Sequence, residues 1–251
     1  MGYSAKTDAA FEMLHRDILN GSHAPGQPLR IAALSALYGV SATPLREALS
    51  RLEEKQLVVG SANRGWRVAP VSLPELEDLE IARLTVETSL LEDAIAHGDL
   101  DWESGIVAAH HRLTQVAPPA GNVDVAARQL WDETHDAFHI ALHAAGRSSW
   151  LKRFFVRTAE QLRLHHQALL FYPRAINPNG PEKHTPETEA LLSRAHSVTA
   201  HTELMQVVLD RDAPVAREKL RLHVEITLEV FRSIAGASVK EKKAKREEQV
   251  I

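Results

Sequence analysis

The 251-residue sequence contains no cysteine, and none of its apolar runs approaches the roughly 20 residues that a helix needs to cross a bilayer. The first absence excludes disulfides, and the second predicts that no segment spans a membrane. The N-terminal segment also lacks the charged and then apolar layout of a signal peptide. Together these absences favour a cytoplasmic protein, although a lack of cysteine by itself is compatible with any compartment.

Signatures of catalysis are missing as well. The sequence has no HExxH metalloprotease pair, no glycine-rich phosphate loop and no serine at a strand-to-helix elbow. The Glu-x-x-His spacing of di-iron bundles occurs only at Glu12 and His15, whereas such a site needs two copies of it. These absences predict that the protein is not an enzyme.

Charge and histidine are distributed unevenly along the chain. Residues 1–72 carry eight Lys and Arg against six Asp and Glu, a net charge of +2, whereas the remainder carries 21 against 27, a net charge of −6. Of the 14 histidines, 12 follow residue 72. Because DNA is a polyanion, the positive excess favours DNA contact by the first part. The histidine-rich second part calls for a separate explanation.

The first 72 residues alternate helical periodicity with turn signals. Apolar residues recur at helical spacing over residues 6–20, and a short helix is expected over residues 31–38. The segment SATPLREALSRLEEKQL predicts a third helix with one apolar face. Two β-type runs, LVVG and WRVAP, then predict a hairpin. Three helices and a hairpin make a winged helix-turn-helix, which we assign to residues 1–72.

Beyond residue 72 only long helical patterns remain. They predict an all-helical domain over residues 73–236, followed by a highly charged and disordered tail over residues 237–251. The expected fold class is therefore mainly α, with an N-terminal winged helix and a C-terminal helical bundle. The six predicted helices of the bundle cover residues 73–97, 101–116, 124–144, 147–172, 186–211 and 213–235.

The third predicted helix offers the groups that reading a major groove requires. Ser41, Thr43 and Arg46 stand at its start, where small polar groups and an arginine can reach bases or phosphates. In the predicted wing, Arg64 and Gly65 can approach a phosphate or the minor groove closely. From spacing alone, an ordinary amphipathic helix with a solvated charged face is the alternative.

The run ALSALYGVSATPLREALSRLEEKQLV, followed by RGWRV, resembles the DNA-binding domain of the GntR family of bacterial regulators. The family pattern reads approximately L-G-V-S-x-T-P-V-R-E-A-L-x-x-L and then R-G-x-x-V. The resemblance covers residues 8–72 and implies that the five residues named above contact an operator. The family often has a polar residue where this chain has Ala32 and Ala42, so the operator sequence cannot be copied from relatives.

Four histidines of the second part fall where the predicted helices would gather them. His135 and His139 are four residues apart and project from one helix face. His201 and His223 each lie ten residues from the tight turn between the last two predicted helices, so an antiparallel hairpin places them opposite one another. Four imidazoles suit a divalent transition metal such as Zn or Ni. The alternative is that each is a surface or core histidine without a metal.

The second part resembles the all-helical FCD effector domain of the FadR subfamily, in ARLTVETSLLEDAIA, in DAFHIAL and in the spacing of its last two helices. The resemblance implies that His139, His201 and His223 bind a metal. Metal-binding members carry an aspartate where this chain has His135, so the metal's identity and the role of His135 stay open. The arrangement is most similar to the glutarate-responsive carbon-starvation regulators of that subfamily.

The same resemblance implies a small carboxylate effector at the open positions of the metal and a homodimer that binds two-fold related DNA half-sites, most often as a repressor. Arg83, at the family's matching helix position, is the first candidate to clamp the carboxylate, and Arg163 is the second. The alternative for Arg83 is an ordinary ion pair with Glu80 or Glu87. For the whole protein, the alternative function is a helical metalloprotein whose metal is structural or hydrolytic.

Overall fold

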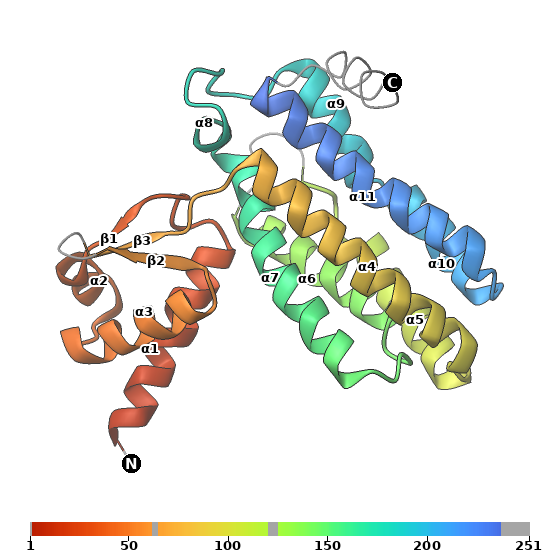
Figure 1. Ribbon diagram of the computed structural model, residues 1–251, viewed down its shortest axis with the longest axis horizontal. Coiled ribbons are helices and arrows are strands. Elements are labelled where there is room, and N and C mark those ends of the chain that lie inside the picture. Colours follow the sequence, from red (N-terminus) through yellow and green to blue (C-terminus); the bar gives the residue numbers. More distant parts are fainter. Residues whose placement is uncertain (1, 62–64, 120–124, 237–251) are drawn as a thin grey trace, which may run out of the picture. The chain divides into compact units, whose positions relative to one another are not determined.

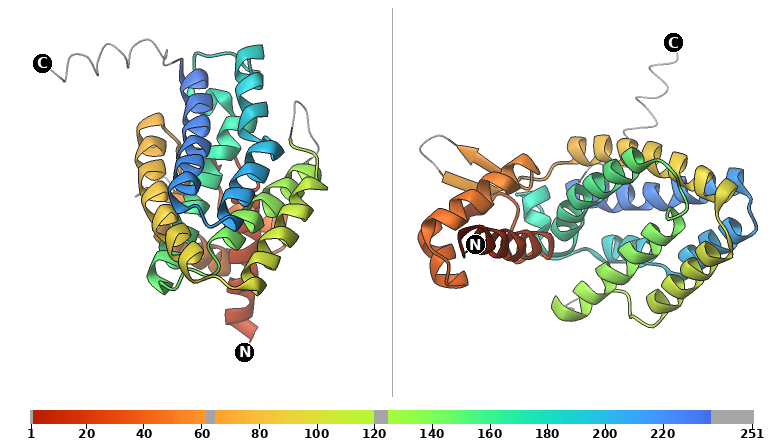
Figure 2. Two further views of the ribbon diagram at one scale, coloured as in Figure 1. Left: turned by 90° about the vertical axis from the view of Figure 1, so that its right-hand side faces the viewer. Right: turned by 90° about the horizontal axis from the view of Figure 1, so that it is seen from below.

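The computed structural model describes residues 2–61, 65–119 and 125–236, and the chain divides into two compact units (Figure 1, Figure 2). Unit 1 consists of the residues up to Leu76 and residues 159–182, and unit 2 of residues 77–158 and the residues from Lys183 onward. Among the described helices, none is both long and apolar enough to span a membrane. The tail expected over residues 237–251 lies outside the described residues.

Unit 1 contains the expected winged helix-turn-helix. Its elements are α1 (Gly2–Leu19), β1 (Pro28–Leu29), α2 (Ile31–Tyr38), α3 (Ala42–Glu54), β2 (Val58–Ser61), β3 (Gly65–Val68), the second half of α7 (Ser149–Phe171) and α8 (Pro173–Ile176). Gly39 ends α2 with a φ of 65°, the left-handed conformation that glycine adopts without strain, and so starts the turn into α3. The three strands pair antiparallel in the order β1-β3-β2. The predicted hairpin is confirmed, while β1 was not predicted.

The apolar face of α3 holds the core of unit 1 together. Leu45, Leu49 and Leu52 are fully buried, as the periodicity predicted, and pack in one cluster with residues of α1. Leu164 and Ala168 of α7 belong to the same cluster. The sequence pattern assigned the whole of this helix to the second domain, but helical spacing does not reveal which core a helix face joins.

Unit 2 is all-helical. Its elements are α4 (Leu73–His97), which starts in unit 1, α5 (Leu100–Thr114), α6 (Val125–Leu142), the first half of α7, α9 (Pro186–Ala195), α10 (Val198–Leu209) and α11 (Ala213–Ala235). Helix α11 packs against α9 and α10, and α5 packs against α6 and α10. Trp131, Phe138 and Leu220 are among the residues of the common core. This packing turns one face of α6, α10 and α11 toward the same interior.

One predicted helix of unit 2 is in fact two. The sequence pattern predicted a single helix over residues 186–211, whereas α9 ends at Ala195 and α10 begins at Val198. The side chain of Ser197 accepts a hydrogen bond from the backbone N–H of Ala200 and thereby caps α10. The predicted cap of the last helix is confirmed, because Asp212 accepts from the N–H of Val215 at 3.1 Å.

Candidate functional site

The start of α3 presents free polar groups to solvent. Ser41, Thr43 and Arg46 are all exposed, and Arg46 forms no hydrogen bond or ion pair with any described residue. The opposite face is anchored, because Leu45 and Leu49 are fully buried. The helix is therefore rigidly held while its first turn is available to a partner.

Gly65, in the predicted wing, has open space around its backbone. Gly65 has a φ of 73°, and a Cβ added there would meet no atom within 4 Å. Its backbone is thus open to close approach, which only a residue without a side chain permits at this φ. Arg64, the other wing residue that the sequence singled out, lies outside the described residues.

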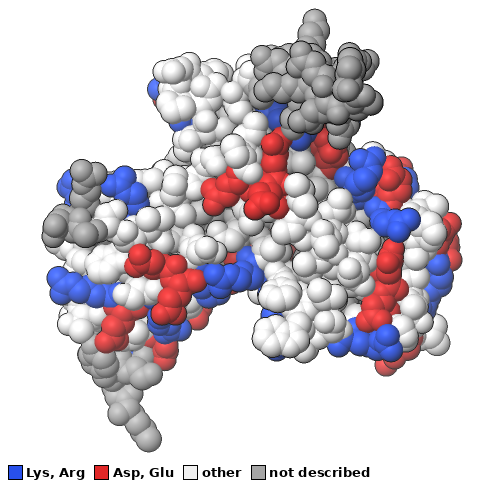
Figure 3. Space-filling model, viewed as in Figure 1, with Lys and Arg blue, Asp and Glu red and all other residues white. Residues whose placement is uncertain are grey.

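Two arginines that the sequence analysis passed over lie on the solvent side of the sheet. Arg67 pairs with Pro28 and Val59, and Val59 is 40% exposed. Residues directly opposite one another on paired strands share a face of the sheet, and successive residues along a strand alternate between faces. Because Leu29 is buried, the next residue, Arg30, lies on the same outer face as Arg67. Among the described residues neither arginine has an ion-pair partner. In Figure 3, Lys and Arg side chains lie at the left edge of unit 1, and Asp and Glu side chains lie beside them on the same face.

The structure brings the four predicted histidines of unit 2 together. One ring nitrogen from each of His135, His139, His201 and His223 lies within 4.8 Å of the others. The ring centroids of His135 and His139 are 4.6 Å apart, and those of His201 and His223 are 4.7 Å apart across the hairpin of α10 and α11. The widest pair, His135 and His223, is separated by 6.0 Å. Three helices therefore converge on one point.

Two of these histidines present buried nitrogen atoms without partners. His139 and His201 are 2% and 0% exposed, and neither ring nitrogen of His139 has a hydrogen-bond partner among the described residues. His201 Nδ1 lies 2.7 Å from the carbonyl oxygen of Ser197, so this nitrogen donates and Nε2 keeps a free lone pair. Unsatisfied buried lone pairs are costly unless a cation or donor meets them.

Burial and neighbouring charges favour the neutral form of His139 and His201. Burial, and then the charge of His135, lowers the pKa of His201 to about 3. Burial and the neighbouring histidines and Arg83 also bring the pKa of His139 well below its ordinary value of 6.5. Neutral imidazole is the form that binds metal ions. The residues present therefore fit a divalent transition metal.

Arg83 lies beside the cluster and is already paired. It is buried, its Nε donates to Glu87 Oε1 at 2.9 Å, and its Nη1 lies 3.7 Å from Glu80 Oε2. The ion pairs that the sequence offered as an alternative are thus both formed. His143, one turn beyond His139, is also buried but is not part of the four-histidine group. Burial lowers the pKa of His143, the charge of Glu87 opposes this change, and the charge of Arg83 reinforces it.

Arg163 does not join this site. It belongs to unit 1, where its Nε donates to the carbonyl oxygen of Leu19 at 3.2 Å and its Nη2 to Asn20 Oδ1 at 3.0 Å. These contacts hold the end of α1, and the effector site proposed below is built without Arg163.

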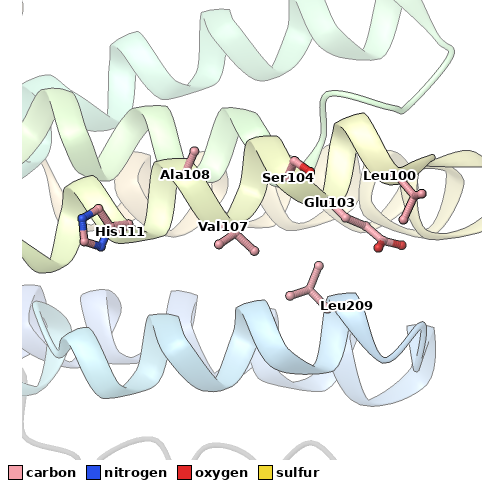
Figure 4. A pocket seen from close by; sticks show the side chains of 7 residues that line it. All are labelled: Leu100, Glu103, Ser104, Val107, Ala108, His111 and Leu209. Atoms are coloured by element: carbon pink, nitrogen blue, oxygen red, sulfur yellow. The ribbon is translucent and has the colours of Figure 1, made fainter.

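An open groove of about 580 Å³ lies between α5 and α10 (Figure 4). Its lining is largely apolar, with Leu100, Val107 and Leu209 beside Glu103 and His111. It contains none of the four clustered histidines. The groove offers no convergent set of polar groups, so the histidine cluster is the stronger candidate site of unit 2.

Comparison with known proteins agrees with this architecture. Residues 6–68 match the family described as bacterial regulatory proteins, gntR family. The HTH-type transcriptional regulator BphR of Paraburkholderia xenovorans LB400 is 31% identical over 225 residues, which cover 90% of this chain and 84% of BphR. The HTH-type transcriptional repressor GlaR of Escherichia coli K12 is 31% identical over 216 residues, 85% of this chain and 90% of GlaR.

Solved structures share the fold. A GntR transcriptional regulator from Rhodococcus sp. RHA1 superposes with a TM-score of 0.66 at 20% identity and covers 93% of this chain and 99% of its own. Escherichia coli McbR/YncC gives a TM-score of 0.65 at 19% identity, with 90% and 96% covered. The expected fold class of a winged helix with a helical domain is confirmed. The chain therefore belongs to the gntR family of bacterial regulatory proteins and is a DNA-binding transcription regulator, not an enzyme.

Proposed function

We propose that this protein is a metabolite-responsive repressor whose helical unit binds a divalent transition metal and senses a small carboxylate there. His139, His201 and His223 would hold the ion, with His135 as the fourth ligand. The observation that carries the proposal is the set of four imidazoles with ligand atoms within 4.8 Å, two of them buried and neutral. A bound Zn or Ni ion would supply a Lewis acid for an oxygen of the effector.

Arg83 is the protein group that would orient the carboxylate. A guanidinium has five N–H donors, and only Nε of Arg83 donates a hydrogen bond to a described residue, Glu87. The remaining donors can pair with an effector oxygen. The resemblance of the sequence to FCD effector domains of the FadR subfamily supports this role, and it suggests a glutarate-type effector as the starting hypothesis.

The DNA-binding surface would combine the start of α3 with the wing. Ser41, Thr43 and Arg46 would contact bases and phosphates in the major groove, and Arg64 with Gly65 would follow the adjacent backbone. Exposure of the first three residues, the lack of a partner for Arg46 in the described part of the chain and the open backbone at Gly65 support this assignment.

Arg30 and Arg67 would add two phosphate contacts, because both lie on the outer face of the sheet without ion-pair partners among the described residues. The protein would act as a homodimer on two-fold related half-sites. The name of GlaR, a repressor, favours repression. Effector binding would shift the helical unit between states with different DNA affinity, and only a difference in effector affinity between those states can move the equilibrium.

The decisive experiment measures metal, effector and DNA binding on the same variants. We expect gently purified wild-type protein to retain Zn or Ni by elemental analysis and native mass spectrometry. His201→Ala should lose the metal and the thermal stabilisation by glutarate, while its metal-free DNA affinity by fluorescence anisotropy stays near that of the wild type. His111→Ala, an exposed histidine outside the cluster, is the matched control.

Three results would contradict the proposal. If the protein binds no transition metal, the cluster is only a group of core histidines. If metal stabilises the protein but no carboxylate adds stability, the metal is structural and the sensing role is wrong. If His201→Ala loses DNA binding together with the metal, the metal is needed for the fold and not for sensing.

A further inference from the structure

A carboxylate at the end of α3 joins both strands of the wing hairpin, β2 and β3. Glu53 Oε1 accepts a hydrogen bond from the backbone N–H of Gly60 on β2 at 3.0 Å, and its Oε2 accepts one from the indole N–H of Trp66 on β3 at 3.3 Å. Gly60 and Trp66 lie directly opposite each other in the sheet. One side chain of α3 therefore connects the helix to the hairpin that lies beside it (Figure 1).

Gly60 leaves room for this carboxylate. Two residues earlier on the same face of β2, Val58 is buried and lies opposite Val68, which is buried as well. Gly60 has no side chain that could continue this apolar anchor. A Cβ added at Gly60 would lie only 2.6 Å from Oε1 and 2.9 Å from Oε2 of Glu53. The carboxylate thus occupies the space of a side chain at residue 60, and a larger residue there would displace it.

The position of Glu53 in its helix makes the two donors important. Glu53 is the penultimate residue of α3, and the partial negative charge at the C-terminal end of a helix disfavours a carboxylate there. Two N–H donors offset this repulsion, and hydrogen bonds to a charged acceptor are stronger than those between neutral groups. The side chain is exposed, so water can replace both bonds when they are lost, and the fold should tolerate their removal.

We propose that Glu53 is a positioning residue for DNA binding, which fixes the wing hairpin against the helix whose first turn would read the major groove. This inference rests on the proposed DNA-binding surface and adds to it a residue that does not touch DNA. The start of α3 and the wing can contact DNA together only in one relative orientation. A hairpin that is already held in that orientation binds more tightly, because less conformational freedom is lost on binding.

Gly60→Ala tests the proposal without changing any charge, because the added Cβ would push the carboxylate of Glu53 away from its donors. The probe is a fluorescent DNA duplex that the wild-type protein selects from a random pool, and affinity is measured by anisotropy. We expect Gly60→Ala to weaken binding about tenfold in the wild type. In a Glu53→Ala background it should change affinity by less than about twofold, because no carboxylate is left to displace.

Two outcomes of this comparison would overturn the inference. An equal loss in both backgrounds would show that the alanine acts on the strand itself and not through Glu53. Unchanged affinity of Gly60→Ala in the wild-type background would show that the position of the carboxylate does not matter for DNA binding. Thermal unfolding of each variant establishes that the protein measured is folded.

Trp66→Phe is the second variant, which keeps an aromatic ring and removes the indole N–H. We expect a loss of about threefold, smaller than that of Gly60→Ala, because the bond from Gly60 to Glu53 remains. In the Glu53→Ala background the same change should have no further effect. A loss of equal size in both backgrounds would show that the ring acts by packing and would remove the indole from the proposal.

Arg67→Ala separates this inference from the proposed DNA-binding surface. Arg67 lies on the outer face of the same hairpin, so a phosphate contact by its side chain depends on how the hairpin is oriented. Loss of one phosphate contact reduces the slope of log affinity against log salt concentration by about one. We expect this reduction when Arg67→Ala is made in the wild type and a smaller one when it is made in Gly60→Ala.

Equal reductions of the salt slope in the two backgrounds would overturn the inference, because a purely structural role of Glu53 lowers thermal stability without altering the contact of Arg67. If Arg67→Ala changes neither affinity nor slope in the wild type, the wing does not contribute this phosphate contact. That result would refute this part of the proposed DNA-binding surface, while the comparison of Gly60→Ala in the two Glu53 backgrounds would still decide the role of Glu53.

Discussion

Glu80 lies on the buried face of α4, and the effect of its ionisation on stability can be measured without any ligand. Burial raises its pKa from the ordinary 4.5 to about 7, with Arg83 opposing and Glu87 reinforcing the rise. The unfolded chain releases this proton near pH 4.5, whereas the folded protein holds it until about pH 7. Between these values the folded state binds more protons, so the contribution of Glu80 to stability is full below pH 4.5 and is lost as the pH rises to 7.

The size of this loss follows from the two pKa values. One pKa unit corresponds to about 1.4 kcal/mol, so the difference between 4.5 and about 7 amounts to about 3 kcal/mol of unfolding free energy. Glu80 is nearly fully buried, and solvent therefore screens little of this effect. Glu80→Gln cannot ionise and should escape the loss. We expect the stability of this variant relative to the wild type to increase by about 3 kcal/mol between pH 4.5 and pH 8.

The assay is urea unfolding of the metal-free protein at a series of pH values, followed by tryptophan fluorescence. Trp102 and Trp131 belong to the core of unit 2 and report on its unfolding. Asp78→Asn, at an exposed position of α4, serves as the control and should track the wild type at every pH. A difference between Glu80→Gln and the wild type that stays constant from pH 4.5 to pH 8 would refute the reasoning, because the carboxyl would then titrate alike in the folded and unfolded states.

Three further predictions concern DNA binding, metal binding and the hairpin. Arg46→Ala should weaken operator binding by about 1–3 kcal/mol in an anisotropy titration, and unchanged affinity would remove Arg46 from the interface. Burial lowers the pKa of His139 and His201, so few protons compete with zinc for these two rings. Zinc affinity, measured by competition titration, should therefore fall between pH 7.5 and pH 6 by much less than the roughly hundredfold expected of four ordinary imidazoles. A hundredfold fall would show that His139 and His201 are not held neutral. Asp212→Ala removes the cap of α11 and should lower the unfolding free energy, measured in denaturant, by about 1 kcal/mol. An unchanged unfolding free energy would show that water replaces the cap without loss.

Local chemistry was sufficient to predict most helices. The bounds of α2, α4 and α11 agree with the periodicity because their ends carry signals that act over a few residues. Gly39 and Gly236 adopt positive φ values after α2 and α11, and Asp212 caps the start of α11. The strand β1 was missed because two residues contain no period, and its pairing with β3 depends on residues nearly 40 positions away.

The histidine cluster could also be anticipated. Spacing on one helix and symmetry about a tight turn are properties of the chain itself, so His135 and His139, and His201 and His223, formed two predicted pairs. That the two pairs meet was an expectation which the packing of α6 against the hairpin fulfils. The role of these residues in metal binding stays a proposal.

The sequence by itself determined the winged helix, the family and the histidine pairs, because each rests on residues close together in the chain or on a local motif. The tertiary structure alone decided which charges are buried. A glutamate at helical spacing looks the same in the sequence whether it faces water or the interior, so the burial of Glu80 could not be foreseen. The same holds for Arg163, whose partners at Leu19 and Asn20 lie about 140 residues away and place it in unit 1. Desolvation depends on all the surrounding atoms, and only the folded chain specifies them.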